Sequence, residues 1–153
     1  MTFKLAVIQG NVDLDHEVRE AACALASDLY GHFEEQEFSG DEVEDVLLPA
    51  WLDDWRNWFP LESLAALGLS PVEGRLRMYA TASASPHIDD MDGLAAILVL
   101  FNDGLTFRQG KVRHRTAPGE WFILDDRLLH EVKEAKDSTV YLCLSLPLQA
   151  ISP

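Results

Sequence analysis

The feature that most constrains the fold of this chain is the change in its pattern at Pro71. After Pro71, short apolar segments alternate with turn-forming residues such as Asn102-Asp103-Gly104, and no segment has the length and spacing of a crossover helix. Parallel strands need such helices between them, whereas antiparallel strands need only turns. The sequence therefore predicts antiparallel strands over residues 74–83, 94–101, 104–109, 111–116, 120–124, 128–133 and 138–146.

The part of the chain before this point is mainly helical in its spacing. Residues 3–8 favour one strand that ends at Gly10. Apolar residues then recur every three or four positions, which predicts an amphipathic helix from Asp13 to Phe33. The acidic residues 34–45 are expected to form a solvated loop or a frayed helix end.

A second helical run is expected after Pro49, and its aromatic residues Trp51, Trp55 and Trp58 share one face. Such a stripe is typical of a core face, although it could also form a lid or an aromatic wall for a substrate. A short helix over Leu61–Leu67 follows and ends at Gly68.

These segments together predict a mainly β (α+β) fold, an antiparallel sandwich or jelly roll with the N-terminal helices packed on the outside of one sheet. The chain 1–153 is expected to be a single domain, because no repeat or long linker divides it. Residues 1–70 would then support the jelly-roll core of residues 71–147, which carries the site.

Composition excludes several classes of function. Acidic residues outnumber basic ones 26 to 12, and a net charge of −14 repels phosphate backbones and anionic lipid. Cys23 and Cys143 form no paired motif, and the N-terminus lacks an apolar run long enough for a signal or a membrane span. We expect a cytoplasmic protein with a small-molecule, peptide or protein substrate, neutral or cationic, and with neither nucleic acid nor a membrane as partner.

Three polar residues in the second half of the chain can meet at one site. His87 and Asp89 lie two positions apart, so both face the same side of an extended segment. His130 follows 43 residues after His87, in a later predicted strand. Two imidazoles and one carboxylate form the facial triad that holds non-haem Fe(II) and leaves positions open for dioxygen and a co-substrate. Asp90 or Asp92 could coordinate in place of Asp89, although the alternation favours Asp89.

The order of these elements resembles the 2-oxoglutarate/Fe(II) dioxygenases, especially the prolyl-hydroxylase-like branch of the double-stranded β-helix fold. The matching residues are Tyr79, Pro86-His87-Ile88-Asp89, Gly104-Leu105-Thr106-Phe107, Pro118-Gly119, Phe122 and His130-Glu131-Val132. The resemblance implies that His87, Asp89 and His130 bind Fe(II), with 2-oxoglutarate and dioxygen as co-substrates. It also implies that Tyr79 hydrogen-bonds the distal carboxylate of 2-oxoglutarate.

The chain departs from this family at the cation that pairs with the same carboxylate. The family places an Arg or Lys on the last strand, where this chain reads Asp137-Ser138-Thr139-Val140-Tyr141. A buried carboxylate without a charged partner is costly, so another cation must take this role if 2-oxoglutarate binds. Arg115 and Arg77 are the leading candidates, and Arg77 would share a strand face with Tyr79. Further candidates are Arg108, Arg113 and Lys136.

The sequence thus predicts an Fe(II)/2-oxoglutarate-dependent dioxygenase that hydroxylates a C–H bond of an amino acid, a peptide or a protein side chain. The missing last-strand cation leaves two alternatives open. One is a non-catalytic, cupin-like β-barrel that binds a small ligand or a metal, and the other is an Fe(II) oxygenase that does not use 2-oxoglutarate. Alternation places His114 on the face opposite Arg113 and Arg115, where it is either a partner in the site or a surface residue, and we expect the surface position. Trp121 is expected between the sheets.

Overall fold

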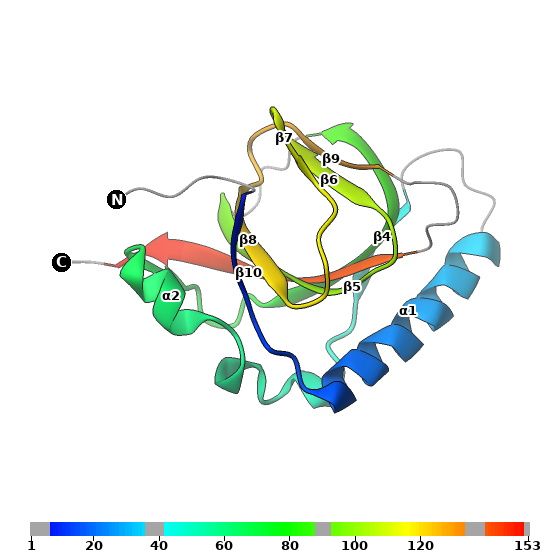
Figure 1. Cartoon of the computed structure of the whole chain (residues 1–153), viewed down its shortest axis with the longest axis horizontal. Coiled ribbons are helices and arrows are strands. Elements are labelled where there is room, and N and C mark those ends of the chain that lie inside the picture. Colours follow the sequence, from blue (N-terminus) through cyan, green and yellow to red (C-terminus); the bar gives the residue numbers. More distant parts are fainter. Residues whose placement is uncertain (1–6, 36–41, 88–92, 134–139, 152–153) are drawn as a thin grey trace.

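The computed structural model describes residues 7–35, 42–87, 93–133 and 140–151, and at a few of them, His87 included, it describes the backbone alone. In these ranges the chain forms curled antiparallel sheets with helices on one side (Figure 1). None of the helices in the described ranges is long and apolar enough to cross a membrane.

Ten strands pair in the described part of the chain, along the path β1-β8-β5-β10-β4-β9-β6-β7, with β2 paired to β4 and β3 paired to β10. Their bounds are β1 Ile8–Asn11, β2 Glu42–Val46, β3 Leu69–Pro71, β4 Arg77–His87, β5 Leu94–Asn102, β6 Thr106–Gln109, β7 Val112–His114, β8 Glu120–Asp125, β9 His130–Lys133 and β10 Tyr141–Ala150. The helical elements are α1 (His16–Glu35), the 3-10 turns η1 (Ala50–Leu52) and η2 (Trp55–Asn57), and α2 (Leu61–Ala66).

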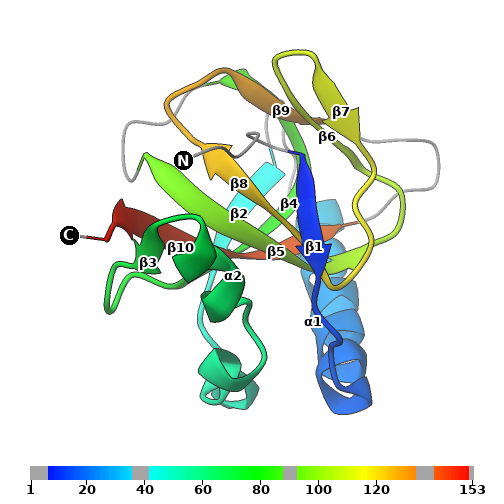
Figure 2. The same cartoon turned by 60° about the vertical axis from the view of Figure 1, so that its left-hand side comes forward.

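Strand β4 belongs to two sheets. From Arg77 to Thr81 it pairs with β10, and at its end His87 pairs with β9. The register shifts between Ala84 and His87, at a point where Pro86 offers no backbone N–H. The strand thereby passes from a larger sheet (β1, β8, β5, β10, β4 and β2) to a smaller sheet (β4, β9, β6 and β7), which lies above it in Figure 2.

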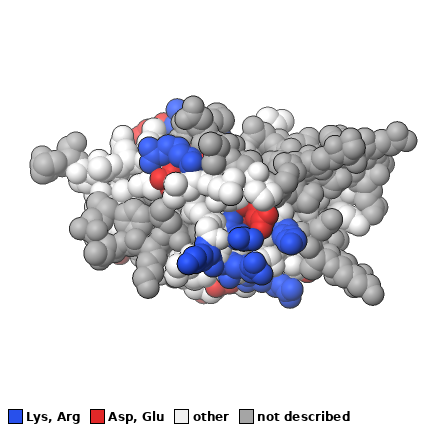
Figure 3. Space-filling model, turned by 90° about the horizontal axis from the view of Figure 1, so that it is seen from above, with Lys and Arg blue, Asp and Glu red and all other residues white. Residues whose placement is uncertain are grey.

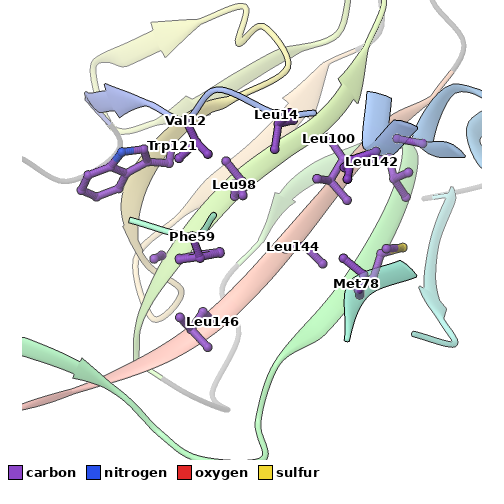
Figure 4. Packing of buried hydrophobic residues seen from close by; sticks show 14 of the residues in the cluster. Val12, Leu14, Phe59, Met78, Leu98, Leu100, Trp121, Leu142, Leu144 and Leu146 are labelled. Carbon is purple, nitrogen blue, oxygen red and sulfur yellow. The ribbon is translucent and has the colours of Figure 1, made fainter. Parts of the chain in front are cut away.

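Alternation along the strands separates two apolar cores. On β10, Tyr141 and Cys143 belong to an inner core between the two sheets, whereas Leu142 and Leu144 belong to an outer core beneath the helices. Figure 4 shows the outer core, in which Leu98 of β5 lies near the β10 leucines. Helix α1 packs against β5, β4 and β10 and covers this face.

The N-terminal segment is fixed to the larger sheet at Gly119. The Val12 N–H donates to the Gly119 carbonyl (2.7 Å), and the Gly119 N–H donates to the Val99 carbonyl (2.8 Å). Gly119 has a φ of 93°, and a Cβ added there would lie 2.5 Å from the Val12 carbonyl oxygen. Only glycine fits this position, because it lacks a Cβ and adopts positive φ without strain.

The predicted fold class is confirmed, with strand bounds that shift by a few residues, and Gly68 does follow a short helix. Two local predictions are wrong, and a third, the helical run after Pro49, holds only in part. Glu42–Val46 is strand β2, where the acidic sequence predicted a solvated loop or a frayed helix end. It forms a strand because its backbone pairs with β4. The run after Pro49 forms two 3-10 turns, whose period of three also brings Trp55 and Trp58 to one side. Trp121 packs in the outer core.

The inner core should make the fold sensitive to alkali. Burial raises the pKa of the Cys143 thiol from 9.0 to about 12, and burial also raises the pKa of Tyr141 above 10.0. Both groups stay neutral in the folded chain and ionise more readily when it unfolds. Stability is therefore complete below about pH 9 and falls as the pH rises towards 12.

Urea unfolding midpoints measured between neutral and strongly alkaline pH test this expectation. The double variant Cys143→Ala/Tyr141→Phe should show a flatter decline, whereas Cys23→Ala, at an exposed thiol, should keep the wild-type slope. An unchanged slope in the double variant would contradict it.

Candidate functional site

The pairing of β4 with β9 brings together two histidines that are 43 residues apart in the sequence. His87 and His130 are direct Cα partners in this antiparallel ladder. Directly opposed positions lie on the same face of a sheet, with Cβ atoms about 5 Å apart. His130 is buried, and its ring lies 6.3 Å from the ring of Phe107 in the inner core. The face that the two positions share is therefore the inner face of the smaller sheet.

A backbone hydrogen bond sets the tautomer of His130. Its Nδ1 lies 2.7 Å from the Leu128 carbonyl oxygen, which can only accept. Nδ1 therefore carries the proton in the neutral ring, and Nε2 carries the lone pair. A backbone carbonyl that binds one ring nitrogen and orients the other is the usual support of a metal-binding histidine.

Asp89, together with Asp90 and Asp92, lies outside the described residues. Within the ranges that the structure describes, no group of three His, Cys, Asp or Glu residues is placed to hold a metal ion. Both ends of the segment that carries Asp89 are fixed, however. It follows His87, and it leads to Gly93, whose N–H donates to the Asp126 carboxylate (2.9 Å) while the Asp126 N–H donates to the Gly93 carbonyl (2.9 Å).

Gln109 is a further candidate residue on this face, and no sequence motif indicated it. It is the Cα partner of His130 on β6, so His130 stands between His87 and Gln109 in the ladder. The Gln109 side chain is buried, and its Nε2 donates to the Asp125 carbonyl (2.7 Å). Its Oε1 is also buried and accepts no hydrogen bond from the described residues. Such an oxygen needs a donor, which water or a bound ligand would supply.

His114 lies inside the barrel, so the expected surface position is wrong. Its ring packs edge-on against Phe107 and Phe122, with ring centroids 5.9 Å and 5.1 Å apart. The alternation had placed it correctly on the face opposite Arg113 and Arg115, both of which are exposed. The opposite face proves to be the interior.

The structure brings Arg77 and Tyr79 together. The Arg77 guanidinium donates to the Tyr79 hydroxyl (3.1 Å), and Tyr79 packs against the inner core. Arg77 is the Cα partner of Ser145 on the last strand, β10. A cation therefore lies next to β10 at a position where β10 itself carries a serine. Arg115 is exposed just after β7 and is not brought to this pair.

Two of the other three cations considered from the sequence lie in the described part of the chain. Arg108 and Arg113 are exposed, and Lys136 lies outside the described residues.

The tryptophan stripe belongs to a different part of the molecule. Trp51, Trp55 and Trp58 pack against the outer core. Trp55 and Leu146 line a hollow of about 280 Å³ on that side of the larger sheet. The hollow is separated from the histidines by the sheet, so the stripe is a core face and forms no wall of the candidate site.

Comparison with known proteins rests on structure. No protein-family model matches the sequence, and no curated protein matches it. A prolyl-4-hydroxylase from Pseudomonas putida has a similar structure, with a TM-score of 0.57, 17% identity and 90% of each chain covered. AviO1 from Streptomyces viridochromogenes is also similar, with a TM-score of 0.50, 13% identity and coverage of 94% of this chain and 90% of that one. The fold is a double-stranded β-helix. At these identities the likeness establishes the double-stranded β-helix and leaves the chemistry to the residues.

The hydrogen bond to Leu128 predicts the Nδ1–H tautomer for neutral His130. A long-range proton–nitrogen correlation spectrum of nitrogen-labelled protein at pH 8 should show this tautomer, since a carbonyl cannot donate to the ring. His16, which is exposed, serves as the comparison within the same spectrum. A proton on Nε2 of His130 would show that the ring is oriented in another way.

Proposed function

We propose that this chain is a non-haem Fe(II) oxygenase that uses 2-oxoglutarate and dioxygen to hydroxylate a C–H bond of an amino acid, a peptide or a protein side chain. The observation that carries the proposal is the direct pairing of His87 with His130 on the inner face of the smaller sheet. The fold supports it, because a rigid β scaffold can hold such residues while coordination positions stay open.

The donor set fits Fe(II). His87 and His130 would each provide an imidazole nitrogen, and Asp89 would provide a carboxylate two residues after His87. The hydrogen bond from Nδ1 to Leu128 leaves Nε2 of His130 as the ligand atom. When bound, the iron supplies the activation of dioxygen that C–H hydroxylation requires.

Other residues of the chain would shape the surroundings of the metal. Phe107 and Phe122 form an apolar wall whose rings lie 4.8 Å apart, and such a wall excludes water from the site. Gln109 Oε1 is buried on the face that holds His130 and would accept a hydrogen bond from an N–H or O–H group of a bound ligand.

Arg77 and Tyr79 would bind the distal carboxylate of 2-oxoglutarate. The guanidinium already donates to the Tyr79 hydroxyl, so the two groups can hold one anion between them. The described inner positions of the last strand, Tyr141, Cys143 and Ser145, are buried and have no positive charge. A cation from the neighbouring strand β4 would therefore replace the one that the family places on the last strand.

Anaerobic addition of Fe(II) and 2-oxoglutarate tests the proposal. A visible charge-transfer band should form, and succinate should appear when air is admitted. His130→Ala should abolish both signals and leave the fold nearly intact, whereas His16→Ala, at an exposed histidine, should retain them. Iron binding without the band or succinate would favour the oxygenase that does not use 2-oxoglutarate, or the non-catalytic cupin-like barrel, over our proposal.

Two arginine variants test the role of Arg77. Arg77→Ala should raise the dissociation constant for 2-oxoglutarate by about 10- to 100-fold, the usual cost of a lost charge-assisted hydrogen bond. Arg115→Ala, at the other leading candidate, should change it by less than about twofold, since an exposed charge contributes little. Calorimetric titration of the anaerobic Fe(II) protein measures both constants, and the reverse order would assign the carboxylate to Arg115.

A further inference from the structure

The outer face of the smaller sheet carries a concentration of positive charge. Its exposed cations, which we call the basic patch, are Arg108, Lys111, Arg113, Arg115 and Lys133. Figure 3 is a view from above, and blue side chains gather on this face. Counted together with Glu131 the patch carries +4, so the rest of a chain with net charge −14 carries −18.

The charges in the patch are arranged at a cost to the fold. Arg108 on β6 is the direct Cα partner of Arg113 on β7, and its partner on the other side is Glu131 of β9. Like charges directly opposed on neighbouring strands destabilise a sheet. Glu131 lies 3.5 Å from the Arg108 guanidinium, so it offsets part of this repulsion. One carboxylate beside five cations leaves an excess of positive charge, which an anionic partner would neutralise.

The patch lies beside the edge of the sheet. In the described part of the chain β7 ends the strand path, and one of its sides pairs with β6. An extended peptide can add a strand to such an edge, and alternate side chains of the added strand then lie on the same face. On the outer face those side chains would lie next to Arg113.

We propose that the basic patch docks an acidic, extended polypeptide segment of a partner protein along β7. Strand β7 has three residues and is therefore only about 10 Å long. A short acidic segment paired with it stays within that length. A nucleic-acid strand would extend past the patch to within a Debye length, about 8 Å, of surface whose total charge is negative. Size and surrounding charge therefore favour the peptide.

The docking surface does not depend on the metal. Its strand residues on β6, β7 and β9 alternate with those of the inner face, and Lys111 and Arg115 flank β7. It should therefore bind its partner whether or not the proposed oxygenase activity is found.

A fluorescein-labelled peptide of alternating Glu and Thr, long enough to span β7, is a suitable probe. Fluorescence anisotropy should show binding at about 20 mM salt that weakens strongly at about 200 mM, as expected for exposed charges. Labelled oligothymidylate of equal charge, measured separately, is the comparison probe for nucleic acid, and it should bind more weakly than the peptide.

Charge reversal separates docking from a structural role. Arg113→Glu should weaken peptide binding about tenfold, yet raise the melting temperature by about 1–2 °C, because the new carboxylate faces Arg108. Arg75→Glu makes the same change of net charge at an exposed site outside the patch and should change binding less than about twofold. If Arg113→Glu does not fold, Lys111→Glu in the turn between β6 and β7 provides the same test.

Three results would overturn the proposal. They are tighter binding of oligothymidylate than of the acidic peptide, equal weakening by Arg75→Glu and Arg113→Glu, and the absence of peptide binding at low salt. The first would assign the patch to nucleic acid, and the others would show that its charge has no specific partner.

Discussion

The constraint on which the rest of this structure depends is the double membership of β4. Its backbone pairs with β10 in the larger sheet and with β9 in the smaller one, so one strand sets the distance and the orientation between the two layers. The register shift falls between Ala84 and His87, where Pro86 interrupts the ladder. Both the inner core and the position of His87 opposite His130 follow from this passage of β4 between the two sheets.

The smaller sheet serves two purposes on its two faces. Each short strand alternates between an inner position and an outer one: Gln109 is buried beside Arg108, which is exposed, and His130 is buried beside Glu131. Neutral polar groups lie inside, where an isolated charge would be costly, and most of the charge lies outside. In the short strands β6, β7 and β9, a single layer of backbone therefore separates the proposed chemistry from the proposed docking surface.

The sequence predicted the features that depend on local alternation, such as strands and the faces of their side chains. It did not predict the features that depend on pairing between distant segments. Strands after Pro71 and the opposing faces of Arg113 and His114 follow from a period of two, but which face is the interior depends on how the sheet closes. The strand Glu42–Val46 exists because β4 offers it a pairing partner, which its own acidic residues do not reveal. Gln109 was missed because a glutamine in a strand has no motif, and only its register beside His130 marks it.

The position of Gly119 has a consequence for how the molecule tolerates damage. Its two backbone hydrogen bonds join Val12 to Val99, and Val12 leads directly into the helix that covers the leucine-rich face of the larger sheet. A side chain at Gly119 would displace Val12 and, with it, the helix from the larger sheet. The exposed face would be broad and apolar, so the first effect of such a substitution would be self-association of otherwise folded molecules.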